Sequence, residues 1–206
     1  MKEKSRKKLW VKRRHRVVFA VLRVILTPIL WLKYRYGADR APIKSGPCII
    51  LNNHQGTMDP FFVAKSFHFP LYFVASDDLF NLKISPLIRW LVNPIPKSKS
   101  MADLNAVKSI LRVLKEGGAV SIAPEGNRTL SGRQWEITDA IAKLVKVSKV
   151  PLVLYNLKGG YGVDPRWGGK ARRGTYYRGC VKRIVPPEEY KDMSVGELFE
   201  LILSLI

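Results

Sequence analysis

The chain has 206 residues, enough for one domain that buries a sizeable core. Apolar residues make up 47% of the chain, which excludes a disordered protein. The formal net charge of +20 predicts a polyanionic partner, which leaves nucleic acid, an anionic membrane surface and phosphorylated substrates as the classes to separate.

The amino-terminal part joins a basic collar to an apolar segment. Residues 2–16 hold nine Lys or Arg side chains and one acidic side chain, and the apolar residues 17–32 follow at once. As a helix this apolar segment reaches about 24 Å, which is short of a hydrocarbon core of about 30 Å. Arg16, Arg23 and Thr27 share one helical face, a pattern that favours a helix lying in a membrane interface.

We therefore predict that residues 1–36 form a basic, amphipathic membrane-associating segment and that residues 37–206 form the main domain. Aromatic side chains flank the apolar stretch as interfacial anchors do: Trp10, Trp31, Tyr34 and Tyr36. Two alternatives stay open, a helix that packs on the domain behind a disordered basic arm and a helix that spans the membrane. A secretory signal is not expected, because Arg23 and Pro28 interrupt the apolar stretch.

The rest of the chain alternates short apolar runs with helical patterns. Strands are predicted at residues 48–51, 71–75, 119–123, 150–157 and 175–185. Helices are predicted at residues 60–67, 86–92, 136–147 and 195–206. One more helix follows Ser100 and Asp103, which resemble a capping box, and stops at Gly117, while residues 37–47 read as a link. We expect an α/β fold in which helices flank a mixed, largely parallel sheet, with a membrane-interfacial helical segment at the amino terminus.

The two cysteines, Cys48 and Cys180, lie in apolar or strand-like stretches and lack metal-ligand spacing. We expect them to be buried free thiols, which implies a reducing compartment. Together with the membrane-associating segment, this predicts a protein attached to the cytoplasmic face of a membrane.

The stretch "NNHQGTMDP", residues 52–60, leaves a predicted strand and presents a histidine and an aspartate. His54 could take a proton from an alcohol, and Asp59 could orient its ring, because four intervening residues including Gly56 allow the chain to turn back. Alternatively, Asp59 and Pro60 are an ordinary helix start, and His54 is a residue at a strand end. This segment alone leaves both interpretations open.

A second loop, "APEGNRTLSG" at residues 123–132, also follows an apolar strand. Pro124 and Gly126 favour a tight turn, and Arg128 presents a planar guanidinium suited to phosphate. A glycine-containing loop with one arginine is also common as a plain connection. The two loops are therefore most informative when they are considered together.

Together they resemble the glycerolipid acyltransferase family typified by 1-acylglycerol-3-phosphate acyltransferase. The family motif NHx4D is matched by Asn53, His54 and Asp59, and the motif PEGxR with a following Ser or Thr is matched by Pro124, Glu125, Gly126, Arg128 and Thr129. The resemblance covers roughly residues 47–160, including a later "VP" followed by a glycine at Val150, Pro151 and Gly159. The sequence departs from the family at Gly56 and Asn127, where Ser and Thr are common, and at Lys97, where Arg is usual.

The resemblance implies acyl transfer from a thioester to the hydroxyl of a lysophospholipid, most directly lysophosphatidate, with no metal and no cofactor. His54 is then the general base and Asp59 its orienting carboxylate. The implied substrate-binding residues are Lys97, Glu125, Gly126, Arg128 and Thr129, of which Arg128 and Lys97 hold the acceptor phosphate. Expected partners are the lysophospholipid, an acyl-coenzyme A or acyl carrier protein thioester, and anionic membrane lipids, but not nucleic acid.

Two other functions stay open. Lys97 in place of arginine leaves room for a different lysolipid acceptor. The charge alone would suit a non-catalytic nucleic-acid-binding protein, although the densest basic block adjoins an apolar segment that such a protein does not need.

Overall fold

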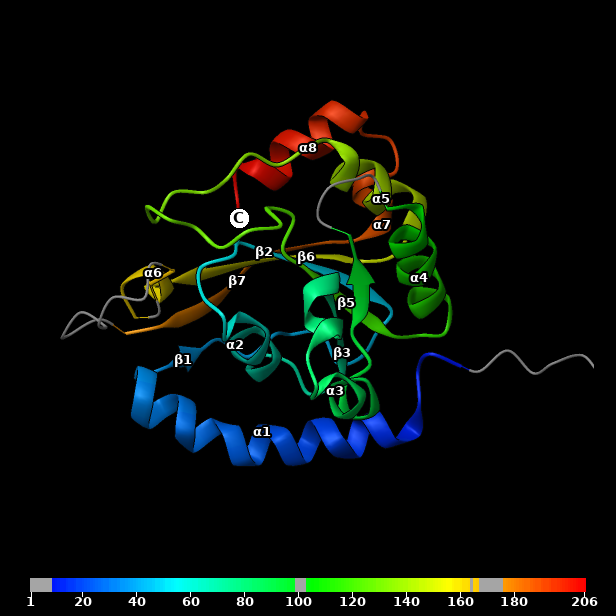
Figure 1. Cartoon of the computed structure of the whole chain (residues 1–206). Coiled ribbons are helices and arrows are strands. Elements are labelled where there is room, and N and C mark those ends of the chain that lie inside the picture. Colours follow the sequence, from blue (N-terminus) through cyan, green and yellow to red (C-terminus); the bar gives the residue numbers. More distant parts are fainter. Residues whose placement is uncertain (1–8, 99–102, 164, 167–175) are drawn as a thin grey trace, which may run out of the picture.

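A computed structural model describes residues 9–98, 103–163, 165–166 and 176–206. Within these residues a seven-stranded sheet crosses the molecule, with helices packed on both of its faces (Figure 1). The strands are β1 (Gly37–Ala38), β2 (Cys48–Asn52), β3 (Leu71–Ser76), β4 (Ile95–Lys97), β5 (Ala119–Ile122), β6 (Leu152–Lys158) and β7 (Arg178–Val185). Their spatial order is β1-β7-β6-β2-β5-β3-β4.

Strands β6, β2, β5, β3 and β4 are mutually parallel, whereas β7 runs antiparallel to β6 and pairs in parallel with β1. The central strand β2 is buried along its whole length, because helices cover both of its faces. The carboxyl ends of the parallel strands meet at one edge of the sheet, where α/β proteins place their binding loops. The predicted mixed, largely parallel α/β fold is confirmed.

The helices form two layers. Their bounds are α1 (Arg13–Tyr34), α2 (Asp59–Lys65), the short 3-10 helix η1 (Asp77–Asn81), α3 (Ser85–Leu91), α4 (Leu104–Lys115), α5 (Ala140–Ser148), α6 (Gly160–Val163), α7 (Pro187–Tyr190) and α8 (Val195–Leu203). Helices α1 and α2 pack on one face of the sheet around Phe62 and Phe67. Helices α4, α5 and α8 pack on the other face around Val113, Val145 and Leu198. Figure 1 shows these two layers above and below the sheet.

All five predicted strands are present, with ends shifted by at most three residues. The two short strands were not predicted: β1 lies in the expected link, and β4 contains Pro96, which a three-residue edge strand tolerates. The cap of α4 is Asp103, whose carboxylate accepts the backbone N–H of Asn105 and Ala106. Ser100 and Thr175, which the predictions also used, lie outside the described residues.

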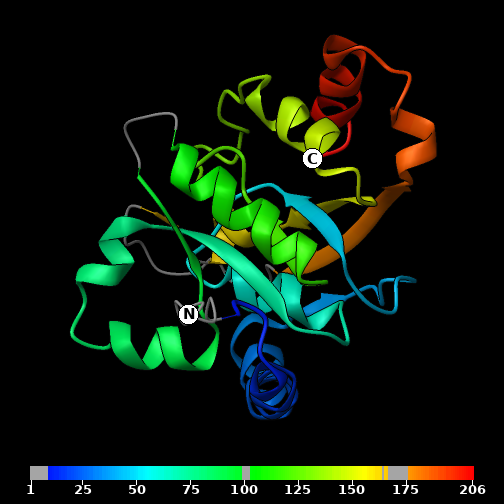
Figure 2. The ribbon, with the colours of Figure 1, turned by 90° about the vertical axis from the view of Figure 1, so that its right-hand side faces the viewer.

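Helix α1 is longer than the apolar segment, since it includes basic residues at both ends. Its 22 residues span about 33 Å, and among the described residues it is the helix with the length and composition to cross a membrane. It nevertheless lies flat against the domain, below α2 and α3 in Figure 1, and Figure 2 views it nearly end-on. Phe19, Leu30 and Tyr34 bury their side chains in the core, as the packed-helix alternative predicts.

Contacts hold both ends of α1 to the domain. Before its first turn, the Glu116 carboxylate accepts the backbone N–H groups of Trp10 at 2.6 Å and Val11 at 2.8 Å. After its last turn, β1 pairs with β7, and the Tyr34 carbonyl accepts the backbone N–H of Tyr177. The helix is therefore fixed along the surface of the domain.

The outward face of α1 is apolar. Val24 is 75% exposed, and the neighbouring exposed side chains are Val17, Val21, Ile25, Ile29, Trp31 and Leu32. Arg23 and Thr27 share one face of α1, as predicted, and both line the groove between α1 and α2. We call the exposed apolar side chains of α1 the α1 outer face.

Both cysteines are free thiols, with Cys48 buried in β2 and Cys180 half-buried in β7. Burial raises the pKa of the Cys48 thiol to about 12, so this thiol stays protonated and unreactive near neutral pH.

Candidate active site

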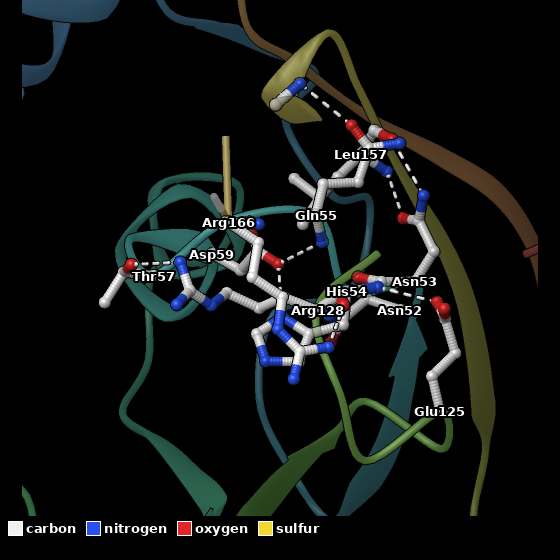
Figure 3. A network of polar contacts seen from close by, with 12 residues as sticks. Asn52, Asn53, His54, Gln55, Thr57, Asp59, Glu125, Arg128, Leu157 and Arg166 are labelled. Atoms are coloured by element: carbon white, nitrogen blue, oxygen red, sulfur yellow. Dashed lines mark hydrogen bonds and ion pairs between the residues drawn. The ribbon is translucent and has the colours of Figure 1, made fainter. Parts of the chain in front are cut away.

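The candidate site begins where β2 ends. The Asn53 side chain continues the sheet beyond β2, because its amide donates to the Leu157 carbonyl at 2.9 Å and its oxygen accepts the Leu157 backbone N–H at 2.7 Å. This two-way contact fixes the chain at the carboxyl end of β2 and directs the next residue, His54, away from the sheet (Figure 3). Asn53 belongs to the predicted motif, but its part in holding β6 follows only from the structure.

His54 and Asp59 form a hydrogen-bonded pair. The His54 Nδ1 atom lies 2.7 Å from Asp59 Oδ2, and the Asp59 side chain is 2% exposed. The same carboxylate accepts the backbone N–H groups of Gln55 at 2.7 Å and Gly56 at 3.0 Å. Asp59 therefore closes the turn that brings its own carboxylate back to the imidazole, as the predicted spacing requires.

The contact with Asp59 selects one tautomer of the His54 ring. A carboxylate only accepts hydrogen bonds, so Nδ1 carries the proton and Nε2 keeps its lone pair. Among the described residues none is hydrogen-bonded to Nε2, and the half-buried ring lines an open cleft. An imidazole held in this way can accept a proton at Nε2, while Asp59 stabilises the imidazolium that forms.

Tyr177 is a further partner of Asp59 that the sequence did not indicate. Its hydroxyl donates to Asp59 Oδ1, and its ring stacks on Phe62 with centroids 3.9 Å apart. Tyr177 is fully buried beside β7, more than a hundred residues along the chain from Asp59. It fixes the carboxylate from the side opposite His54, so the orientation of Asp59 depends on the carboxyl-terminal part of the fold.

The second predicted loop packs directly on the first. The Glu125 carboxylate accepts the backbone N–H of His54 at 2.8 Å and that of Trp135 at 2.9 Å. The backbone N–H of Thr129 donates to the His54 carbonyl at 2.9 Å. Burial raises the pKa of Glu125, although both backbone donors oppose that rise. Glu125 and Thr129 therefore hold the His54 backbone from two directions.

Contacts within the second loop, residues 123–132, account for the presence of Gly126 and Thr129. Gly126 has a φ of +66°, a left-handed conformation that favours glycine. The buried Thr129 hydroxyl donates to the Arg133 carbonyl at 2.6 Å and accepts the Gly132 N–H at 2.9 Å. The predicted substrate-binding roles of Glu125, Gly126 and Thr129 stay predictions, and the contacts observed for Glu125 and Thr129 are with the protein itself.

Arg128 lies beside the pair formed by His54 and Asp59. Its Nη1 donates to the Thr57 hydroxyl at 2.9 Å, and Thr57 belongs to the turn between His54 and Asp59. Its carbonyl accepts N–H groups from Trp135 and Arg166, which hold the backbone of the loop. Figure 3 shows Arg128, Thr57 and His54 in one group. The two predicted motifs therefore meet at one place.

Lys97 lies at the same edge of the sheet but farther away. It ends β4, which is separated from β2 by β5 and β3. Three strand spacings amount to about 14 Å, and the exposed Lys97 ammonium contacts the neighbouring Ser98 carbonyl. The structure does not bring Lys97 to the group formed by His54 and Arg128, so its role as a phosphate ligand stays a prediction.

The open cleft has a volume of about 360 Å³. It is lined by Asn53, His54, Gln55, Glu125, Thr129, Gly132, Arg133, Gln134, Asn156, Leu157, Lys158, Gly159 and Ile206. Arg133 and Lys158 add two exposed cations that the sequence did not single out, and Gln55 Oε1 accepts the Gly160 N–H at 2.8 Å. In the part of the chain that the structure describes, no three His, Cys, Asp or Glu side chains gather as metal ligands do.

Comparison with known proteins finds one matching family. Residues 35–155 match the model described as Acyltransferase, which covers more than half of the chain. A 1-acyl-sn-glycerol-3-phosphate acyltransferase from Pseudomonas aeruginosa is 28% identical over 159 residues, covering 73% of this chain and 56% of that protein. The corresponding protein from Borreliella burgdorferi is 27% identical over 154 residues, covering 68% of this chain and 60% of that protein.

A solved structure shares the fold. The crystal structure of the 1-acyl-sn-glycerophosphate (LPA) acyltransferase PlsC from Thermotoga maritima superposes with a TM-score of 0.72 at 18% identity, covering 93% of this chain and 80% of that one. A chloroplastic relative from Brassica napus, also a 1-acyl-sn-glycerol-3-phosphate acyltransferase, is 23% identical over 128 residues, covering 60% of this chain and 36% of its own. The chain thus matches between about a third and three fifths of the length of these curated relatives.

Proposed function

The chain belongs to the acyltransferase family, which confirms the resemblance carried by the two motifs, and on that premise we propose that it converts lysophosphatidate to phosphatidate. The fatty acyl group would come from an acyl thioester. The observation that carries the proposal is the pair formed by His54 Nδ1 and Asp59 Oδ2, 2.7 Å apart, which leaves Nε2 facing the cleft. The names of the relatives support the choice of acceptor.

In the proposed reaction, His54 Nε2 removes the proton of the acceptor hydroxyl as that oxygen attacks the thioester carbonyl carbon. A carbon–oxygen bond forms, and the carbon–sulfur bond then breaks. The departing thiolate takes the proton from the His54 imidazolium, so the free thiol and the new ester are the products. Asp59 stabilises the imidazolium between the two proton transfers, which is the task that its buried position suits.

The acceptor phosphate needs cations near the catalytic pair. Arg128 supplies a guanidinium that the Thr57 hydroxyl already orients, and such a group binds phosphate oxygens in pairs. Arg133 and Lys158 line the cleft together with His54, whereas Arg128 is not among its lining residues, and these two cations can also bind the phosphate. Lys97 would take part only if its side chain or its strand approached the cleft.

We further propose that the protein works at the cytoplasmic face of a membrane, because both substrates carry long acyl chains. The α1 outer face supports this, since isolated exposed apolar residues are ordinary but an apolar face on one helix is not. Ile84, Leu87 and Trp90, around α3, are also about half exposed. With both ends of α1 held to the domain, we infer that α1 lies in the interface and does not span the bilayer.

The reaction is tested by incubating the purified chain with lysophosphatidate and a labelled acyl thioester, followed by mass spectrometry of the lipids. Labelled phosphatidate that forms with the wild-type protein and not with His54→Ala is the expected result. Turnover by His54→Ala at the wild-type rate would exclude the proposed base. Parallel assays with other lysolipid acceptors, and with coenzyme A or acyl carrier protein thioesters, identify the preferred acceptor and donor.

Attachment is tested by substitution and not by deletion, because removal of residues 1–36 would take Phe19, Leu30 and Tyr34 out of the core. The variant Val24→Glu with Ile25→Glu should release the protein from vesicles, since it places two carboxylates on the α1 outer face. The matched control is Leu104→Glu with Val147→Glu, two exposed positions on α4 and α5. Equal vesicle binding by both double variants would contradict attachment through α1.

A further inference from the structure

A second basic group lies on the flank of α1, outside the catalytic cleft. It consists of Arg23 in α1, Arg40 after β1, Lys65 at the end of α2 and His68 in the following turn, and we call it the flank cluster. Arg23 Nη1 lies 2.8 Å from His68 Nδ1, and Arg40 Nε lies 2.6 Å from His68 Nε2. One exposed imidazole is therefore placed between two guanidinium groups.

These contacts leave polar groups unsatisfied. A neutral imidazole has one acceptor nitrogen and one N–H, so it cannot accept from both arginines in either tautomer. One of the two contacts sets an N–H of the ring against an N–H of a guanidinium. In addition, Arg23 Nε is buried and has no hydrogen-bond partner. An acceptor with several oxygen atoms would satisfy these donors together.

In the part of the chain that the structure describes, no carboxylate balances the positive charge of the flank cluster. Among the described residues, the ion pairs do not include any member of the flank cluster. Burial, and then Arg40, lower the pKa of Arg23; burial, and then Arg23, lower that of Lys65. Burial and the two arginines likewise lower the pKa of His68. The positive charges of Arg23, Lys65 and His68 are therefore disfavoured by burial and by neighbouring arginines, and a bound anion would offset that cost.

We propose that the flank cluster binds the phosphate of an anionic phospholipid, at a site separate from catalysis. Arginine guanidinium groups bind phosphate oxygens in pairs, and the side chains of Arg40 and His68 are exposed to an incoming headgroup. Helix α2 separates the two sites, since Asp59 begins the helix and Lys65 ends it, about 9 Å apart along the axis.

The apolar surroundings of the flank cluster favour a lipid, and not a free phosphate ion, as the source of that phosphate. Arg23 and Lys65 border a narrow groove between α1 and α2. The other residues that line this groove are mainly apolar: Phe19, Leu22, Leu26, Leu30, Pro60, Phe61, Ala64, Leu71, Phe73 and Val92. An interfacial helix buries its apolar face about 5–10 Å into the headgroup boundary, so side chains on the flank of α1 lie near headgroup depth. This step rests on the attachment proposed above.

The test uses monomeric dihexanoyl phosphatidylglycerol, which presents a phosphodiester without a charged surface, and follows the ring resonances of His68 by NMR in the full chain. We expect this lipid to shift the His68 resonances, whereas dihexanoyl phosphatidylcholine and inorganic phosphate at the same concentration do not. Arg40→Gln with Lys65→Gln should raise the Kd by at least about tenfold, since two charged hydrogen-bond donors are lost.

The matched control is Arg13→Gln with Arg16→Gln, which removes the same charge from exposed positions on α1 and should leave the Kd within about twofold. An equal loss in both double variants, a shift confined to His54, or equally tight binding of inorganic phosphate would overturn the proposal. Vesicle binding is measured separately. If the wild-type protein binds no vesicles, the proposed membrane attachment is wrong. The titration with monomeric lipid still decides whether the flank cluster binds the headgroup.

Discussion

Two histidines in this protein have opposite electrostatic surroundings. His54, at the carboxyl edge of the sheet, contacts the buried carboxylate of Asp59. His68, beyond the far end of α2, lies between two guanidinium groups. The Asp59 carboxylate accepts a hydrogen bond from His54 Nδ1 and leaves Nε2 to accept a proton, whereas burial and the two guanidinium groups disfavour the imidazolium form of His68. The same side chain is therefore a candidate base at one end of α2 and a candidate part of an anion site at the other.

The largest expected effect comes from His54 and Asp59, the proposed catalytic pair. Both His54→Ala and Asp59→Asn should lower kcat by about 10²- to 10⁴-fold, because a positioned general base contributes that much. Steady-state assays of phosphatidate formation measure the loss, and circular dichroism checks that the variants fold. An Asp59→Asn variant with wild-type kcat would mean that the carboxylate does not assist His54.

Arg23 and Arg40 contact His68 directly, whereas Arg128 contacts Thr57 in the turn after His54. A substitution of Arg128 tests whether its guanidinium binds the acceptor phosphate. We expect Arg128→Ala to raise KM for lysophosphatidate by about 10- to 100-fold, the value of one charge-assisted contact. Lys115→Ala removes an equal charge from an exposed position of α4 and is the control. If KM and kcat both stay at wild-type values, Arg128 does not contact the acceptor.

Tyr177 tests whether the rigidity of Asp59 matters in addition to its charge. Tyr177→Phe removes one hydrogen bond to Asp59 Oδ1 and should lower kcat by about tenfold with little change in KM. The control is Tyr190→Phe, because the buried Tyr190 hydroxyl donates to the Val150 carbonyl far from the site. Equal kcat losses in the two variants would assign Tyr177 to general stability alone.

The smallest effect concerns a third histidine, His15, which is buried in α1 with Nδ1 2.9 Å from the Tyr72 hydroxyl. Burial, Arg14 and Lys12 lower the pKa of His15 to about 4. The folded state therefore disfavours the protonated form of His15. The contribution of neutral His15 to the free energy of unfolding is complete above the unfolded pKa of about 6.5 and is lost as the pH falls toward 4.

Between about pH 7.5 and about pH 5.5 the wild-type protein should therefore lose about 1 kcal/mol of unfolding free energy more than His15→Gln does. Glutamine keeps a polar contact with Tyr72 and does not titrate. Urea unfolding at both pH values measures the difference. Parallel pH dependence of the two proteins would show that His15 is not held in its neutral form.

The five longer strands and the main helices could be predicted from the sequence, because buried parallel strands are short apolar runs that are visible in the local composition. It also placed both motif loops at strand ends, since the polar residues follow those runs directly. It missed β4, which contains a proline and only three residues, and it began α5 four residues early, at Glu136. Neither feature has a strong local signal, because both depend on pairing or packing with distant parts of the chain.

What the sequence alone determined is the chemistry available: the residue types and spacing of His54 and Asp59, the arginine of the second loop, and a basic segment joined to an apolar one. What only the tertiary structure decided is which groups meet. Tyr177 contacts Asp59, Glu125 holds the backbone of His54, and Arg23 of α1 contacts His68. The reason is physical: spacing along the chain fixes local geometry, but contacts across a hundred residues form only when the sheet and its two helical layers pack.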